Sequence, residues 1–240
     1  LHLKGFEKLG VDIKEEYGEI YCNTEKIVGT QIHLDLPSVG ATENIILASC
    51  LGEGTTVITN AAREPEIEDM IKYLNKMGAK INGAGTDKVE IIGVKRLAEV
   101  SYNIMPDRIE AGTYILIGAL CGNQLKIDNI IPEHIDSLLS KLEEIGTELE
   151  IGADYIIVSK SDRYKSTNIK TAVYPGFPTD LQQPFTVLLT QCNGKSKVME
   201  TIWENRFMHV PYLIQMGADI TVKNQTATII GPTALTGSEV

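Results

Sequence analysis

The stretch GFPTDLQQPF, residues 176–185, places one carboxylate, Asp180, between two prolines and directly before an apolar run. Thr179 or Asp180 can cap the helix expected there, although Pro184 limits how early regular helical hydrogen bonding begins. Alternatively, an acid on a loop held by Pro178 is well placed to accept a proton as a general base. The residue pattern by itself leaves both interpretations open.

The stretch ETIWENRFMH, residues 200–209, contains Arg206 and the only tryptophan of the sequence. A guanidinium is a planar fork that binds a phosphate or carboxylate group through paired hydrogen bonds. Arg206 is therefore a candidate contact for an anionic substrate.

The stretch DLPSVGATEN, residues 35–44, places Pro37, Ser38 and Gly40 before an expected helix. Unpaired backbone N–H groups at a helix N-terminus form a natural anion site. Ser38 is also a typical N-cap residue, and on this stretch alone simple capping is the favoured interpretation.

Two further stretches, AAREPEIEDM and MPDRIEAGTY, combine acids with an arginine at an expected helix start. The first contains Glu64 next to Pro65, and the second contains Asp107. A proline-started or capped helix with acids in its first turn explains both patterns without any chemistry.

The composition argues against several classes of function. The net charge of -10 disfavours nucleic-acid binding, which needs clustered Lys and Arg. The apolar runs are shorter than the roughly 20 residues of a bilayer-spanning helix, and no charged-then-apolar leader precedes the fold. We therefore expect a cytoplasmic protein with no membrane partner.

The cysteines and histidines show no metal-binding spacing, so no metal site is predicted. We expect the four cysteines to be reduced and mostly buried, as in a cytosolic protein. Their positions are Cys22, Cys50, Cys121 and Cys192.

A repeat of about 70 residues supplies the elements that must position these side chains. In each copy an amphipathic helix ends at a glycine, which is expected to adopt a left-handed conformation, and a strand follows. An apolar helix, another glycine and a strand precede this unit, and a further strand closes it. The helix-ending glycines are Gly10, Gly78, Gly146 and Gly217.

This order predicts βαβαββ modules and an α/β (α+β) layered fold. The first helix of each module is apolar nearly all round, so we expect it to be buried, with the second helix partly solvated. The segment RLAEVSYNIMPDRIEAGTY breaks the regular spacing and contains Pro106. We therefore place a junction near residue 105, which gives domains 1–104 and 105–240.

Six stretches taken together resemble the bacterial UDP-N-acetylglucosamine enolpyruvyl transferases over residues 1–240. They are PSVGATENI, NAAREPEIEDM, MGAKINGAGTD, PDRIEAGTY, FPTDLQQPFT and ENRFMHVPYLIQMGA. The resemblance implies two domains of three βαβαββ modules each, in an inside-out α/β barrel. Residues 1–104 would then be part of the first domain, and residues 105–240 would be two modules of the second.

The resemblance implies transfer of the enolpyruvyl group of phosphoenolpyruvate to the 3-hydroxyl of UDP-N-acetylglucosamine, with release of phosphate and without a metal or organic cofactor. This reaction is the first committed step of peptidoglycan synthesis. Asp180 would deprotonate the sugar hydroxyl, and Arg206 would orient Asp180. The residues implied to contact substrate or line the cleft are Leu1, Leu36, Pro37, Ser38, Val39, Glu64, Asp107 and Ile202.

This sequence differs from the family pattern in two respects, and two alternative functions stay open. Position 36 is Leu, in contrast to family members that have Lys there, so a side-chain phosphate contact is not expected and backbone contacts stay possible. The family's reactive-Cys loop would precede Leu1 and a late Arg would follow Val240, so this polypeptide alone is expected to be inactive. The alternatives are a related transferase acting on shikimate phosphate and a noncatalytic UDP-sugar-binding module of the same fold.

Overall fold

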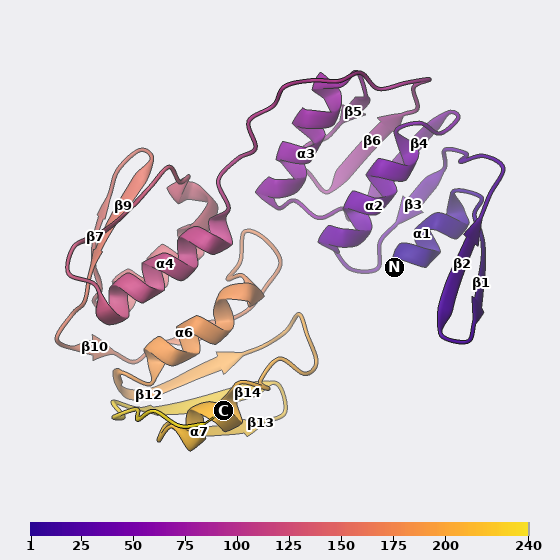
Figure 1. The fold of residues 1–240 in the computed structure, drawn as a ribbon. Helices are drawn as coiled ribbons and strands as arrows, with labels where there is room; N and C mark the ends of the chain where they lie inside the picture. Colours follow the sequence, from indigo (N-terminus) through magenta and orange to yellow (C-terminus); the bar gives the residue numbers. More distant parts are fainter. Residues whose placement is uncertain (240) are drawn as a thin grey trace. The chain divides into compact units, whose positions relative to one another are not determined.

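The computed structural model describes residues 1–239 and divides into two compact units, Leu1–Met105 and the residues from Pro106 onward (Figure 1). Each unit has its own hydrophobic core. Among residues 1–239, no helix has the length and apolar character to cross a membrane. The assignment of these units to the two domains of the transferase family stays a prediction.

The first unit contains one complete βαβαββ module, as the repeat predicts. Its sheet has the order β3-β4-β6-β5, in which β3 and β4 are parallel and the other pairs antiparallel. Helix α1 (His2–Lys8) and the hairpin β1 (Asp12–Glu16) and β2 (Glu19–Asn23) precede the module. The module comprises β3 (Gln31–His33), α2 (Val39–Ser49), β4 (Thr55–Thr59), α3 (Pro65–Lys76), β5 (Lys80–Asn82) and β6 (Lys88–Ile92).

The last part of the second unit repeats this module with the same strand order, β11-β12-β14-β13. Helix α6 lies between the sheet and α4 (Arg108–Cys121) (Figure 1). A short 3-10 turn, η2 (Thr179–Leu181), leads directly into α6. The module comprises β11 (Asn168–Lys170), α6 (Gln182–Leu189), β12 (Cys192–Met199), α7 (Val210–Gln215), β13 (Asp219–Lys223) and β14 (Thr226–Gly231).

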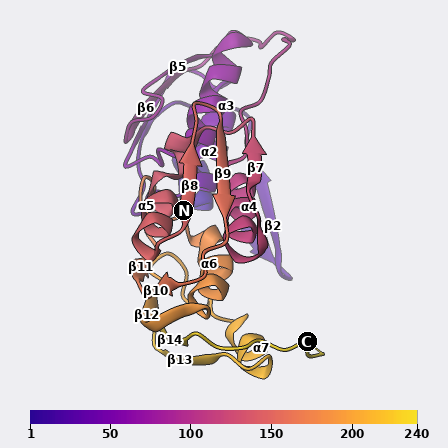
Figure 2. The same cartoon turned by 90° about the vertical axis from the view of Figure 1, so that its left-hand side faces the viewer.

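The middle repeat departs from the predicted module because no first strand precedes α4. Its sheet has three strands in the order β7-β9-β8, which Figure 2 shows side by side. β10 (Tyr164–Lys165) pairs with β12 in parallel. After α4 the repeat comprises β7 (Leu125–Asp128), the 3-10 helix η1 (Pro132–Ile135), α5 (Asp136–Ile145), β8 (Glu148–Ile151) and β9 (Tyr155–Ser159).

The segment at the position of the missing strand, which contains Ser101 and Tyr102, makes its side-chain contacts with α3. Tyr102 donates its hydroxyl hydrogen to Asp69 at 2.8 Å, and the Lys76 ammonium donates to the Ser101 carbonyl at 2.8 Å. The Tyr102 ring also lies 5.3 Å from the Tyr73 ring, centroid to centroid. These contacts hold the segment against α3, and the segment forms no strand.

The predicted left-handed glycines are confirmed at all four helix ends. Their φ angles are +90° at Gly10, +102° at Gly78, +91° at Gly146 and +106° at Gly217. Glycine adopts this conformation without the steric cost of a Cβ atom, so the chain can turn from helix to strand within a few residues.

Among the first helices of the modules, α6 comes nearest to the expected burial: Phe185, Leu188 and Leu189 are inaccessible to solvent, whereas Pro184 and Val187 are partly exposed. The expectation is wrong for α2 and α4, which leave Leu47 and Tyr114 exposed among other apolar side chains. α6 packs against α4 and β12, and α4 packs against α6 and the strands β7 and β9, yet Tyr114 and Ile117 of α4 remain exposed. An apolar helix is buried only where elements pack on several of its faces.

The cysteine expectation holds for two residues and fails for two. Cys50 and Cys192 are buried, and burial raises the pKa of both thiols, that of Cys192 to about 12. Cys22 and Cys121 are exposed. Cys22 lies on the β1–β2 hairpin, where every residue of β2 is exposed, and Cys121 is the last residue of α4.

Leu142 on α5 tests how much the core of the second unit contributes to its stability. Its side chain is fully buried, so Leu142→Ala should lower the free energy of unfolding by about 2 to 5 kcal/mol. The neighbouring exposed Glu143→Ala should change it by no more than about 0.5 kcal/mol. Urea unfolding followed by circular dichroism measures both, and equal effects would contradict this packing.

Candidate functional site

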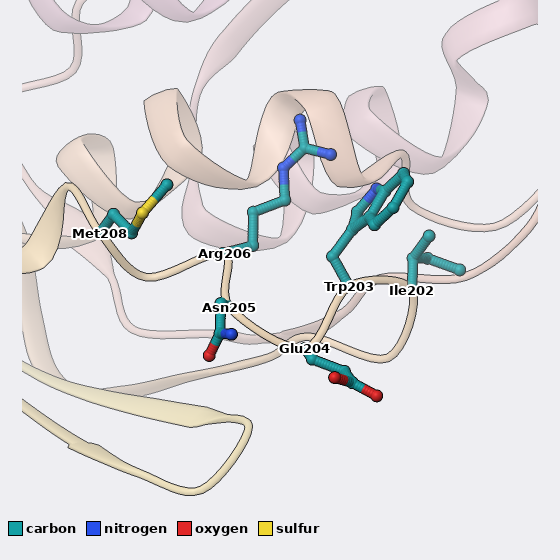
Figure 3. A pocket seen from close by; sticks show the side chains of 6 residues that line it. All are labelled: Ile202, Trp203, Glu204, Asn205, Arg206 and Met208. Atoms are coloured by element: carbon teal, nitrogen blue, oxygen red, sulfur yellow. The ribbon is translucent and has the colours of Figure 1, made fainter. Parts of the chain in front are cut away.

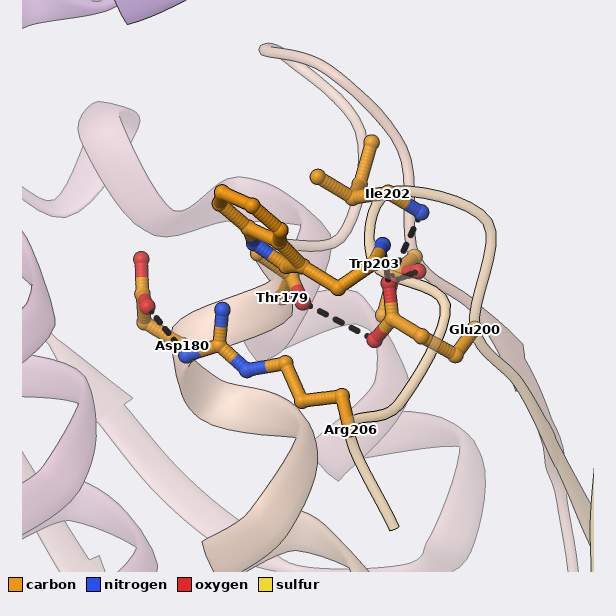
Figure 4. A network of polar contacts seen from close by, with 7 residues as sticks. Thr179, Asp180, Glu200, Ile202, Trp203 and Arg206 are labelled. Carbon is orange, nitrogen blue, oxygen red and sulfur yellow. Dashed lines mark hydrogen bonds and ion pairs between the residues drawn. The ribbon is translucent and has the colours of Figure 1, made fainter. Parts of the chain in front are cut away.

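Asp180 lies in the 3-10 turn η2, and its carboxylate does not cap a helix. No side chain makes a capping hydrogen bond at the start of η2 or α6. Instead, Asp180 Oδ1 accepts a hydrogen bond from Arg206 Nη2 at 2.6 Å (Figure 4). The cap interpretation is therefore wrong, and the side chain remains 53% exposed and free to meet a ligand.

The Arg206 guanidinium has two partners, Asp180 in η2 and Gln183 at the start of α6. Besides its bond to Asp180, its Nε donates to the side-chain oxygen of Gln183 at 2.7 Å, with the Gln183 amide oriented to satisfy both of its ends. The Gln183 amide nitrogen then donates to the Thr179 carbonyl at 3.2 Å. A guanidinium has five N–H donors, so this arrangement fixes the fork and still leaves donors for an anion.

A cavity of about 620 Å³ lies beside this pair, lined by residues 202–206 and Met208. Ile202, Trp203, Arg206 and Met208 project to one side of the loop, whereas Glu204 and Asn205 project to the other (Figure 3). An indole, an aliphatic side chain and a guanidinium on one face suit a ligand with both a flat ring and an anionic group.

Glu200 is a residue of this site that the sequence interpretation missed. It is 1% exposed and follows β12, where its carboxylate accepts hydrogen bonds from two loops. The signal was the alternation of inward positions along the strand, Ser196 and Val198 being buried and Glu200 next in phase. A charged residue at an inward position indicates a buried polar network.

In the first unit the candidate segment starts α2, and Ser38 caps it. Ser38 Oγ accepts a hydrogen bond from the backbone N–H of Ala41 at 3.3 Å, so the capping interpretation is confirmed. Leu36 is exposed, and Pro37 and Val39 are partly exposed. These residues form an accessible helix start.

The start of α1 lies against the start of α2. A Cβ atom on Gly40 would lie 3.0 Å from the His2 ring, and the Asn44 amide lies 2.7 Å from His2 Nδ1. The structure thus brings Leu1, which precedes α1, close to the segment that contains Leu36.

Glu64 and Asp107 both precede helices but differ in environment. Asp107 Oδ1 accepts hydrogen bonds from the backbone N–H groups of Ile109 and Glu110 at 2.7 and 3.2 Å, as a capped start predicts. Glu64 precedes the proline-started α3, is 7% exposed, and its Oε2 is buried without a hydrogen-bond partner. The two acids belong to different units, so a shared cleft stays a prediction.

Carboxylates gather near the start of α3. Partial burial raises the pKa of Glu43, and the charges of Glu66 and Glu64 raise it further. Within residues 1–239, no three His, Cys, Asp or Glu side chains form a group placed to hold a metal ion.

A protein-family match and similar proteins identify the family of this chain. The protein family described as EPSP synthase (3-phosphoshikimate 1-carboxyvinyltransferase) matches residues 1–240. The chain belongs to the EPSP synthase family. A UDP-N-acetylglucosamine 1-carboxyvinyltransferase of Halothermothrix orenii is 52% identical over 240 residues, which are 100% of this chain and 58% of that protein. The chain spans about half the length of the curated relatives it matches.

Two solved structures share the fold of this chain. The enolpyruvyl transferase NikO from Streptomyces tendae has a TM-score of 0.88 at 23% identity, covering 97% of this chain and 58% of that one. An EPSP synthase from Acinetobacter baumannii has a TM-score of 0.66 at 18% identity, covering 99% of this chain and 59% of that one. The predicted enolpyruvyl transferase fold is confirmed.

His209, next to the cavity in this EPSP synthase family chain, tests the burial of the loop by its pH dependence. Burial lowers the pKa of His209, although a backbone hydrogen bond at Arg206 opposes the effect, and Nε2 has no partner among residues 1–239. The unfolded chain therefore binds a proton more readily than the folded chain. Stability should fall as the pH drops below the ordinary histidine pKa of about 6.5 toward the lowered folded value.

The measurement is the urea midpoint of unfolding at about pH 7.5 and about pH 5.5, for the natural chain and for His209→Gln. The glutamine variant should lose less stability between these two values. An identical loss in both proteins would show that His209 titrates alike in the folded and unfolded chains.

Proposed function

We propose that this chain forms part of an enzyme that transfers the enolpyruvyl group of phosphoenolpyruvate to the 3-hydroxyl of UDP-N-acetylglucosamine. The observation that carries the proposal is the Asp180–Arg206 pair, whose side chains lie 2.6 Å apart and whose arginine lines the cavity. The sequence of the chain is 52% identical to a relative named UDP-N-acetylglucosamine 1-carboxyvinyltransferase. The two substrates are small molecules. The enzyme would act in the cytoplasm, and its reaction would be the first committed step of peptidoglycan synthesis.

Asp180 is proposed as the general base. A sugar hydroxyl is a weak nucleophile, so a carboxylate must take its proton while the new C–O bond forms at C2 of phosphoenolpyruvate. The methylene carbon gains a proton in the same addition, which gives a tetrahedral phospholactyl adduct. Loss of a proton from that carbon and of phosphate from C2 restores the vinyl group. Arg206 would hold Asp180 toward the hydroxyl.

The remaining candidate residues are proposed to bind the nucleotide sugar. Ile202 lines the cavity and would contact the uracil or ribose. In the first unit, residues 36–39 and Leu1 would contact the UDP portion through the exposed start of α2. Glu64 and Asp107 would line the cleft.

A transferase acting on shikimate phosphate is the second candidate, since the matching family carries that substrate in its description. Sequence identity favours the UDP-sugar. The relative from Halothermothrix orenii is 52% identical, whereas the EPSP synthase structure from Acinetobacter baumannii is 18% identical, a likeness that supports the fold alone.

Asp180→Asn tests the general base in the full-length protein encoded by the reading frame that carries this chain. The amide keeps the size and the contact with Arg206 but cannot accept the proton, so turnover should fall by about 100-fold or more. Binding of UDP-N-acetylglucosamine, measured by calorimetry, should remain. The exposed Asp219→Asn serves as the control. Unchanged turnover in Asp180→Asn would remove the proposed base.

The 240-residue chain alone separates the candidate functions. Calorimetry should detect UDP-N-acetylglucosamine and give no response to shikimate 3-phosphate, and the opposite result would favour the second candidate. With phosphoenolpyruvate added, no phosphate should be released. Of the six residues that line the cavity, Arg206 alone is cationic, and the adduct's phosphate and carboxylate need several cations. Measurable phosphate release would overturn the expected inactivity.

A further inference from the structure

The carboxylate of Glu200 is buried, and both of its oxygens accept hydrogen bonds. Oε1 accepts from Thr171 Oγ1 at 2.8 Å and from the backbone N–H groups of Ile202 at 2.8 Å and Trp203 at 3.2 Å. Oε2 accepts from Thr179 Oγ1 at 2.8 Å. Figure 4 shows the carboxylate between the Thr179 turn and the loop that carries Trp203.

All four partners suit a carboxylate, which only accepts hydrogen bonds. Its two oxygens offer about four lone-pair sites and no donor, and all four partners of Glu200 present an N–H or O–H group. A carboxylate that is 1% exposed is tolerated only when such donors replace the water it has lost. The network is therefore a built feature of this fold.

The donors come from two parts of the chain, the connection from β11 to η2 and the loop after β12. Thr171 follows β11, Thr179 directly precedes Asp180, and Ile202 and Trp203 begin the loop that leads to Arg206. Glu200 thus joins the backbone next to the acid to the backbone of the loop that carries its arginine.

Two further bonds tighten the same junction. Thr201 Oγ1 donates to the Thr171 carbonyl at 2.6 Å, and the Thr201 backbone N–H donates to Thr171 Oγ1 at 2.9 Å. Thr201, the residue after Glu200, is therefore also held against the residue that follows β11.

We propose that Glu200 is a positioning residue for the transfer reaction: by bracing the Thr179 turn against the 202–203 backbone, it sets the separation of Asp180 and Arg206. This role rests on the proposed function. Glu200 itself is too deeply buried to touch substrate, so it acts through the two loops that it joins.

The hydrogen-bond pattern predicts a graded response to substitution. In Glu200→Gln the amide oxygen can keep the Oε1 bonds, and the amide nitrogen can donate to Thr179, whose hydroxyl also accepts. Glu200→Ala removes every acceptor and leaves two backbone N–H groups unpaired. The alanine variant should therefore free the loop, and the glutamine variant should largely restore it.

The loop contains a built-in reporter, because Trp203 is the only tryptophan of the chain. In the 240-residue chain, Glu200→Ala should raise acrylamide quenching and lower the fluorescence anisotropy of Trp203 relative to Glu200→Gln. Leu142→Ala is the matched control, since it removes buried contacts on α5, outside the Glu200 network. Equal fluorescence changes in Glu200→Ala and Leu142→Ala, or none in either, would overturn the brace.

Kinetics of the full-length protein then test the link to catalysis. Because small misplacements of catalytic groups are costly, Glu200→Ala should lower kcat by roughly 100-fold, with KM for each substrate changed less, and Glu200→Gln should recover most of kcat. Leu142→Ala should keep its kcat below its unfolding temperature. An unchanged kcat in Glu200→Ala, or an equal loss of kcat in Leu142→Ala, would overturn the proposal.

The two arms separate this inference from the proposed function. If the natural full-length protein shows no turnover with phosphoenolpyruvate and UDP-N-acetylglucosamine, the proposed function fails and the catalytic role of Glu200 fails with it. The brace itself is still decided by the Trp203 fluorescence of the variants.

Discussion

The buried carboxylate of Glu200 constrains the loops of the second unit because its two oxygens accept four hydrogen bonds at once. It takes donors from Thr171, Thr179 and the 202–203 backbone, so none of these segments can shift without leaving a buried polar group unpaired. Such a loss typically costs about 1 to 3 kcal/mol. The positions of Asp180 and Arg206 follow from this constraint, since each lies within a few residues of a braced segment.

The Asp180–Arg206 pair has a different physical role. With the two side chains 53% and 24% exposed, solvent screens their attraction, and such pairs contribute no more than about 1 kcal/mol to stability. The pair is therefore too weak to hold the loop in place. It orients two side chains whose backbones are already fixed, and it leaves one carboxylate oxygen and several guanidinium donors for a ligand.

Most of the fold was predictable from the sequence because it repeats. The positive φ of Gly78 and Gly217 and the βαβαββ order follow from helix-ending glycines and from hydrophobic periodicity. The missing strand before α4 was not predictable, because the contacts of Tyr102 with α3 are tertiary. That Asp180 pairs with Arg206 and does not cap a helix was not predictable either, because Arg206 is 26 residues away in the sequence and the local pattern does not contain this contact.

Most of the candidate residues share one topological position, Leu1 and Asp107 excepted. In each complete module the first two strands are parallel, β3 with β4 and β11 with β12, and ligands of α/β sheets bind beyond the carboxyl ends of such strands. Leu36 follows β3, Glu64 follows β4, Asp180 follows β11, and the loop of Ile202 and Arg206 follows β12. The same module thus presents two loops at the same edge in both units, and divergence of those loops is enough to give one unit an exposed helix start capped by Ser38 and the other an acid paired with an arginine.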